Sequence, residues 1–207
     1  MLEEAVAEAG GGLALRCDVQ DPADCRSVVD ATVDAFGGLD ALVYATAVDP
    51  LVRIREASAE LWTSTFATNV FGASQVCAAA LPHLQATRGR AIFVSASSIG
   101  RPVPTMGVYA SSKAALEEMV RAWRSEHEDV AFCSARVGST LGTGVMDAWD
   151  GEISREMGAS YQRGGYDLDN GPGMMECDDC AESIIAALIA PVCIREFTAT
   201  AAPRAAV

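Results

Sequence analysis

The sequence lacks the features of a secreted, membrane-spanning or nucleic-acid-binding protein. Its first residues, Met1-Leu2-Glu3-Glu4, are acidic, whereas a signal peptide needs a basic start and then an apolar run. Its longest apolar tract, residues 184–194, is too short to cross a bilayer and contains Pro191. The net charge of −13 argues against a nucleic-acid partner and against an anionic membrane surface, because both attract basic patches. We therefore expect a cytoplasmic protein that binds neither.

The sequence also has no disulfide framework and no metal-binding motif. Its seven cysteines are an odd number, scattered at positions 17, 25, 77, 133, 177, 180 and 193. Cys177 and Cys180 have the spacing of half a metal or redox site, but no second cluster of cysteine or histidine accompanies them. We expect ordinary reduced thiols and no metal.

What the sequence does contain is an almost unbroken alternation of strand-like and helix-like segments. The expected strands are Leu13–Cys17, Leu39–Ala45, Arg90–Ala96, 130–135 and 192–198, and the expected helices are 2–9, 22–36, 59–84, 107–128 and 178–190. Residues 138–173 are expected to be irregular, with aromatic and methionine side chains that suit a substrate lid. The alternation predicts one α/β domain over residues 1–200, a doubly wound parallel sheet, followed by a loose tail at 201–207.

The most informative stretch is Tyr109-Ala-Ser-Ser-Lys113, at the start of an expected helix. Residues four apart on a helix share a face, so the lysine lies close to the phenol. A free phenol titrates near pH ~10 and is a poor base at neutral pH, but a nearby positive charge favours the phenolate. The pattern therefore indicates a tyrosine that acts as an acid and base.

The order and spacing of several motifs resemble those of the short-chain dehydrogenase/reductase family. The resemblance runs from Leu13 to Phe197, and its motifs are Cys17-Asp18-Val19, Gly38-Leu39-Asp40-Ala41-Leu42-Val43, Asn69-Val70-Phe71-Gly72, Ser97-Ser98-Ile99-Gly100, Tyr109-Ala-Ser-Ser-Lys113 and Arg136-Val137-Gly138-Ser139-Thr140. It implies a Rossmann-like fold and a hydride transfer between NAD or NADP and a small or medium alcohol or carbonyl substrate. It also implies a homodimer or homotetramer paired through helices 59–84 and 107–128.

The resemblance further implies a catalytic set of four residues. Tyr109 would exchange the substrate proton, and Lys113 would support it and bind the nicotinamide ribose. Ser97 would hydrogen-bond the substrate oxygen. Ser97 stands one residue closer to Tyr109 than is usual in the family, so Ser98 remains the alternative. Asn69 would hold a water that relays protons to Lys113.

The cofactor would contact two further segments, again by resemblance. Asp18 and Val19 would touch the adenine ring, while Val137 and Thr140 would lie on the nicotinamide side. The family's Asn-Asn-Ala-Gly signature is replaced by Tyr44-Ala45-Thr46-Ala47, which places a bulkier side chain beside the adenosine path.

The family's first strand, its glycine-rich turn and its second strand have no counterpart in the sequence. Gly10-Gly11-Gly12 precedes a different element from the one that follows the family's glycine-rich turn. Compared with the family, we expect the sequence to be shorter by roughly 40 residues, the size of a βαβ unit. Without them the edge of the Leu39–Ala45 strand lacks a neighbour. Either Leu13–Cys17 pairs there, or a segment outside this sequence does, or the assigned start codon is wrong. The alternative function is a truncated, catalytically silent relative that serves as a partner subunit or reflects a gene-model artefact.

Overall fold

The computed structural model describes residues 2–100, 103–144, 149, 151–163 and 173–201. Its elements, in chain order, are α1 (Leu2–Glu8), α2 (Pro22–Phe36), β1 (Ala41–Tyr44), the 3₁₀ turn η1 (Ile54–Glu56), α3 (Ala59–Phe66), the π-helix η2 (Ala67–Gly72), α4 (Ala73–Thr87), β2 (Arg90–Ala96), α5 (Gly107–Glu126), β3 (Ala131–Val137), α6 (Gly151–Arg163), α7 (Cys177–Ile189) and β4 (Glu196–Ala199). The expected tail at 202–207 lies outside the described residues.

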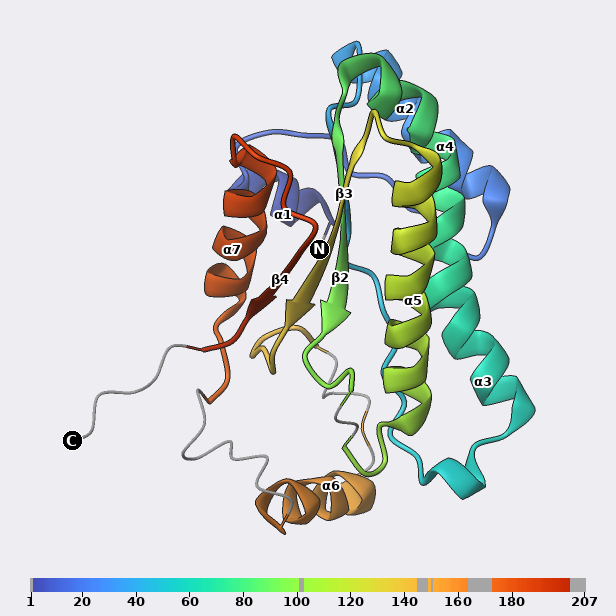
Figure 1. The fold of residues 1–207 in the computed structure, drawn as a ribbon, viewed down its shortest axis with the longest axis vertical. Coiled ribbons are helices and arrows are strands. Elements are labelled where there is room, and N and C mark those ends of the chain that lie inside the picture. Colours follow the sequence, from blue (N-terminus) through green and yellow to red (C-terminus); the bar gives the residue numbers. More distant parts are fainter. Residues whose placement is uncertain (1, 101–102, 145–148, 150, 164–172, 202–207) are drawn as a thin grey trace, which may run out of the picture.

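The four strands form one parallel sheet in the order β1-β2-β3-β4. Helices cover both faces: α4 and α5 lie on one side of the sheet, and α7 lies on the other (Figure 1). The doubly wound α/β fold in a single domain is therefore confirmed. All the strands run in the same direction, so their carboxyl ends meet at one end of the molecule, where α6 also lies (Figure 1).

Local sequence signals set the ends of the helices. Asp21 caps α2 by accepting a hydrogen bond from the Ala23 amide at 2.7 Å, and Pro22 occupies the first turn. Gly37 ends the helix in the left-handed region, with φ 79°. Ser58 caps α3 through a bond from the Leu61 amide. The expected single helix over 59–84 is instead interrupted by the π-helix.

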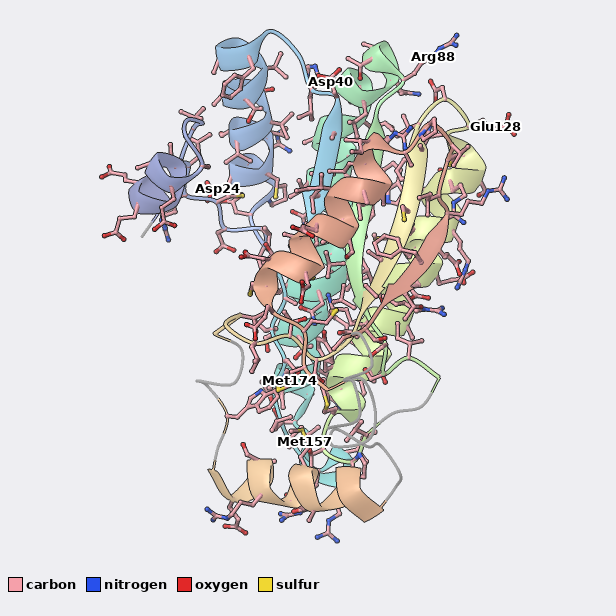
Figure 2. All side chains as sticks on the ribbon, turned by 90° about the vertical axis from the view of Figure 1, so that its left-hand side faces the viewer. Asp24, Asp40, Arg88, Glu128, Met157 and Met174 are labelled. Atoms are coloured by element: carbon pink, nitrogen blue, oxygen red, sulfur yellow. The ribbon has the colours of Figure 1, made fainter. Side chains whose placement is uncertain are left out.

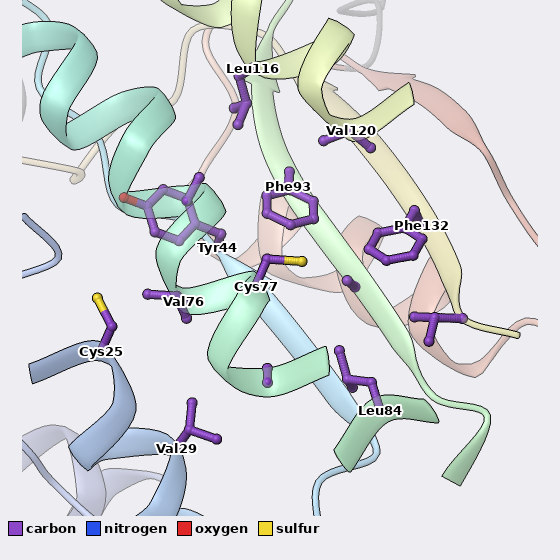
Figure 3. Close-up of a cluster of buried hydrophobic side chains, with 14 residues drawn as sticks. Cys25, Val29, Tyr44, Val76, Cys77, Leu84, Phe93, Leu116, Val120 and Phe132 are labelled. Atoms are coloured by element: carbon purple, nitrogen blue, oxygen red, sulfur yellow. The ribbon is translucent and has the colours of Figure 1, made fainter. Parts of the chain in front are cut away.

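The main core lies between the sheet and the helices α2, α4 and α5. Figure 3 shows the rings of Phe93 and Phe132 packed among side chains that include Leu84, Leu116 and Val120, and all five are fully buried. Burying each such side chain stabilises the fold by about 1.5–3 kcal/mol. This packing fixes α5 against β2 and β3, the arrangement on which the site depends.

A smaller cluster covers the other face of the sheet. Ile92, Cys133 and Ala135 pack there with Ala187 of α7. Val43 pairs with Ile92 in register and so shares this face, yet Val43 remains 39% exposed. The side chains on this face of the sheet are therefore less well buried at β1 than at β2 and β3.

The prediction of a strand at Leu13–Cys17 is wrong. The segment has no strand assignment, and Leu13 and Leu15 are 45% and 37% exposed. A strand needs a neighbouring ladder, and among the described residues β1 pairs only with β2. The outer edge of β1 therefore carries no strand from the described part of this chain.

Two other expectations are corrected. Residues 138–173 are not wholly irregular, because they contain α6. The last strand is shorter than expected and begins at Glu196 rather than at Val192, since residues 190–195 follow α7 as a connection before pairing with β3 starts.

Candidate active site

Lys113 is the only lysine in the chain, and it is one of the most deeply buried side chains. It lies on α5 with 1% of its surface exposed, and its Nζ donates a hydrogen bond to the Val94 carbonyl at 2.7 Å. The Nζ lies 5.7 Å from the centroid of the Tyr109 ring. The helix thus brings the two residues together as the spacing predicted, close enough for the ammonium to interact with the phenol.

Burial lowers the pKa of Lys113 to about 8, and the charge of Asp49 acts in the opposite direction. Burial disfavours a charged ammonium because the protein interior solvates it poorly. The Val94 carbonyl is a neutral acceptor, so it orients the ammonium without neutralising it. At neutral pH, Lys113 is therefore positively charged but close to its titration range.

Asn69 lies in the π-helix and is fully buried. Its Oδ1 accepts a hydrogen bond from the Val48 amide, and its Nδ2 donates to the Val48 carbonyl and to Ser112 Oγ, all at 2.8–2.9 Å. Ser112 in turn donates to the Tyr109 carbonyl at 2.7 Å. Asn69 therefore ties the segment after β1 to the turn of α5 that carries Tyr109.

The two candidate serines follow β2 directly. Ser97 is exposed, and its amide donates to the Val137 carbonyl at 3.0 Å, which continues the pairing of β2 with β3. Ser98 Oγ is buried and has no hydrogen-bond partner among the described residues. Ser97 thus presents its side chain at the carboxyl end of the sheet, and Ser98 remains the alternative.

Asp18 and Val19 lie in the loop before α2. Asp18 is exposed and accepts a hydrogen bond from the Gln20 amide, while Val19 packs against the main core. Gln20 Nε2 donates to Thr68 Oγ1 at 3.1 Å, and a Cβ added to Gly72 would lie 2.8 Å from Val19. The loop is therefore docked on the π-helix.

Val137 is the last residue of β3, and Thr140 follows three residues later. Thr140 Oγ1 donates to the Gly138 carbonyl at 3.1 Å. Thr140 also forms an isolated parallel bridge with Met175, just before α7. This loop lies beyond the carboxyl end of the sheet, the end at which Figure 2 shows Met157 and Met174.

The sequence did not point to Asp49, whose charge acts on Lys113. Asp49 helps to line a cavity of about 550 Å³, together with residues that include Gln20, Leu61, Thr65, Thr68 and Thr143. Burial raises the pKa of Asp49 to about 7, and the charge of Lys113 partly offsets this rise. No motif marks Asp49, because a single aspartate before a proline is typical of an ordinary loop.

Contacts of the expected lid region were also not predicted. Trp149 Nε1 donates to the Asp49 carbonyl at 3.0 Å, and Arg53 forms an ion pair with Glu156 of α6. The part of this region that the structure describes therefore closes over the segment that follows β1. Met146 and Tyr166, which were also expected in the lid, lie outside the described residues.

Tyr44 proves to fit its unusual position. The side chain is 3% exposed, its ring lies 6.3 Å from that of Phe93, and its hydroxyl donates to the Thr68 carbonyl at 2.6 Å. A π-helix shifts the helical hydrogen-bond pattern by one residue. The Tyr44 hydroxyl thus provides a donor for a carbonyl of that helix, and the tyrosine belongs to the core.

The residues fit one end of a dinucleotide better than the other. The ammonium of Lys113 and the hydroxyls of Tyr109 and Thr140 are donors suited to a ribose and a carboxamide. A pyrophosphate favours backbone amides at a helix N-terminus. The glycine turn at residues 10–12 follows α1 and leads into residues 12–18, which form neither a helix nor a strand, so no helix begins at this turn.

Comparison with known proteins gives the family of the chain. The sequence model of the family described as short chain dehydrogenase matches residues 1–150. An 11-beta-hydroxysteroid dehydrogenase A of Arachis hypogaea is 30% identical over 185 residues, which cover 84% of this chain and 50% of that protein. An L-fucose dehydrogenase of Oryctolagus cuniculus is 33% identical over 117 residues, 56% of this chain and 41% of that protein. The chain spans about half or less of the length of these relatives.

Solved structures show the same fold at low sequence identity. An alcohol dehydrogenase from the archaeon Thermococcus sibiricus, complexed with 5-hydroxy-NADP, has a TM-score of 0.77 and 23% identity, and the match covers 96% of this chain and 78% of that one. A 3-ketoacyl-(acyl-carrier-protein) reductase from Brucella melitensis, complexed with NADH, has a TM-score of 0.80 and 18% identity, with coverage of 96% and 81%. No helix in the described residues is long and apolar enough to span a membrane.

Proposed function

Because the chain belongs to the short-chain dehydrogenase family, we propose that it is an NAD(P)-dependent oxidoreductase of small or medium alcohols or carbonyls. The observation that carries the proposal is the buried Lys113 beside the Tyr109 ring. Burial of a lysine ammonium costs free energy, so a buried lysine at the carboxyl end of a parallel sheet favours a functional role. The bound nicotinamide would supply or accept the hydride.

The chain's own residues handle the proton. Tyr109 gives a proton to the substrate oxygen in reduction and takes it in oxidation, while the Lys113 charge stabilises the phenolate form. Ser97 hydrogen-bonds the same substrate oxygen. Asn69 keeps Tyr109 and the segment after β1 in register through Ser112 and Val48. A water relay at Asn69 would have to use its oxygen atoms, since both Nδ2 hydrogens already have acceptors.

On the cofactor side, Lys113, Tyr109, Val137 and Thr140 would hold the nicotinamide and its ribose. Asp18 and Val19 would lie against the adenine. The choice between NAD and NADP is open, and so is the substrate. The relatives are named for hydroxysteroid and L-fucose substrates, which differ too much to favour one chemical class.

The alternative, a catalytically silent relative, rests on one observation: the glycine turn at residues 10–12 does not lead into a helix N-terminus that could hold a pyrophosphate. The family match favours the enzyme, but it does not bear on the affinity of this 207-residue form for a dinucleotide. We also propose a homodimer or homotetramer in the cytoplasm. Phe71, 53% exposed on the π-helix, lies within residues 59–84 and suits the proposed pairing through residues 59–84 and 107–128.

Titration of the protein with NADH and NADPH, followed by cofactor fluorescence, tests the proposal. We expect saturable binding of at least one cofactor. No binding up to millimolar concentration would overturn the enzyme assignment for this chain. Where binding is found, Tyr109→Phe should retain it and abolish turnover, because the ring remains while its exchangeable proton is lost. Ser98→Ala serves as the comparison for Ser97→Ala, and only the latter should lower kcat.

A further inference from the structure

Asp49 stands out among the carboxylates because one of its oxygens has no partner. Oδ1 is buried and makes no hydrogen bond among the described residues. A buried polar atom without a partner costs about 1–3 kcal/mol, and more when it is charged. Such an atom needs an explanation from its surroundings.

The backbone around Asp49 is fixed from both sides. Asn69 binds both the amide and the carbonyl of Val48, the residue before it. Trp149 donates to the carbonyl of Asp49 itself. These contacts hold the main chain, so the Asp49 side chain starts from a fixed position at the cavity that it helps to line.

The buried ammonium of Lys113 needs a compensating negative charge. Its ammonium is 1% exposed, and its hydrogen bond to the Val94 carbonyl brings no opposite charge. A buried ammonium is stabilised only when an anion compensates for the lost water. Asn69 brings the two residues to the same place, because it bonds Val48, the neighbour of Asp49, and Ser112, the neighbour of Lys113. The charge of each then acts on the other.

Other charged groups near the two residues are already engaged. Glu117, one turn further along α5, accepts hydrogen bonds from Arg136 and Ser95 and forms an ion pair with Arg121. Arg53, in the segment that follows Asp49, pairs with Glu56 and Glu156. The remaining titratable group facing Lys113 is the phenol of Tyr109, on the same helix.

We propose that Asp49 is a positioning residue that keeps Lys113 in its charged form, through an electrostatic contact across the site rather than a direct hydrogen bond. Its consequence for Tyr109 rests on the proposed function, because a neutral Lys113 would no longer stabilise the phenolate. The coupling itself is a property of the protein without any ligand.

The test uses the single lysine of the chain. Protein labelled with ¹³C and ¹⁵N in lysine gives one side-chain amine signal, whose NMR titration reports Lys113 alone. We expect a midpoint near the pKa of about 8 in the wild type. In Asp49→Asn the midpoint should fall by about one pH unit or more, the size of the effect of a nearby opposite charge. Asp49→Glu should restore most of it.

The matched control is Asp34→Asn, which removes the same charge from an exposed position on α2. It should leave the Lys113 midpoint unchanged. An Asp49→Asn midpoint equal to that of the wild type would overturn the proposal. Where Asp49→Asn does not fold, the wild type is labelled in both aspartate and lysine. A Lys113 signal that shifts in step with the titration of an aspartate carboxyl supports the coupling, and a Lys113 signal that follows no carboxyl titration refutes it.

Turnover separates this inference from the proposed function. In an active enzyme, Asp49→Asn should move the acidic limb of the alcohol-oxidation pH profile to higher pH, while Asp34→Asn should not. A shifted Lys113 midpoint in a protein without turnover supports the coupling and counts against the enzyme. An Asp49→Asn variant with turnover and an unshifted Lys113 midpoint refutes the coupling and supports the proposed function.

Discussion

Removal of the Arg136 guanidinium should destabilise the protein, because it leaves a buried carboxylate uncompensated. Glu117 of α5 has a side chain that is only 2% exposed, and it accepts hydrogen bonds from both Nε and an Nη of Arg136. Ser95 Oγ donates to the same carboxylate at 2.9 Å. Ser95 and Arg136 are register partners on β2 and β3, so Glu117 fastens α5 to both strands at once.

The magnitude follows from what remains after Arg136→Met. Breaking a buried pair from one side costs about 3–5 kcal/mol. Arg136 is 32% exposed, and Arg121 stays 3.4 Å from Glu117, so the loss should fall at or just below the lower end of that range. We expect a loss of about 2–3 kcal/mol in the free energy of unfolding. Since a domain of this size loses roughly 2–4 °C in Tm per kcal/mol, Tm should fall by roughly 5–10 °C.

Urea unfolding followed by far-UV circular dichroism measures this loss. Arg121→Met is the matched control, because Arg121 reaches the same carboxylate from a side chain that is 41% exposed and should cost less than about 1 kcal/mol. Adding Glu117→Gln to Arg136→Met should recover at least half of the loss, since no buried charge then remains. Equal effects of the two arginine variants, or no recovery in the double variant, would refute this account of the network.

The pH dependence of the same network has a defined sign. Burial raises the pKa of Glu117, but the hydrogen bonds from Arg136 and Ser95 outweigh burial, and the net shift is downward. A carboxyl group with a depressed pKa in the folded state stabilises the protein above its unfolded pKa of about 4.3. This contribution is lost as pH falls through the folded pKa. The difference between the wild type and Arg136→Met should therefore shrink below about pH 4.

Two further variants test the packing around the π-helix. Gly72→Ala would place a Cβ within 2.9 Å of the Val19 side chain and carbonyl, so it should lower the free energy of unfolding in urea by about 1–3 kcal/mol. Gly158→Ala in α6 would meet nothing within 4 Å and should raise the free energy of unfolding by up to about 1 kcal/mol. Equal effects of the two would contradict the docking of Val19. Tyr44→Phe removes the buried hydroxyl that donates to Thr68 and should lower the free energy of unfolding by about 1–2 kcal/mol, and an unchanged urea midpoint would show that bond to be unimportant.

The sequence predicted those features that depend on local patterns. Tyr109 and Lys113 share a helix face because their spacing places them there, and Asn69 was found through its own motif. The strands β2 and β3 are mostly apolar, as is typical of strands buried on both faces, and their position was predicted closely.

Other features depend on neighbours that no local pattern reveals. Leu13–Cys17 has the composition of a strand, but a strand forms only beside a ladder, and no described segment supplies one. Helix α6 was not predicted, because Gly151 and Gly158 are typical of an irregular segment. The helical signal was only the spacing of Ile153 and Met157, four residues apart. Asp49 could not be identified, because its importance comes from Lys113, 64 positions away in the sequence.

The same contrast explains why the two halves of the proposed site differ. The proton-transfer half is assembled from α5, the π-helix and the segment after β1, and each is anchored to the main core by contacts within the described residues. The phosphate half would need a turn at a helix N-terminus, and residues 10–12 lead into a segment that is neither helix nor strand. Stability of the first half therefore does not depend on the second. Intact geometry at Tyr109 and Lys113 follows from folding alone, and a titration with NADH or NADPH tests whether that geometry serves hydride transfer.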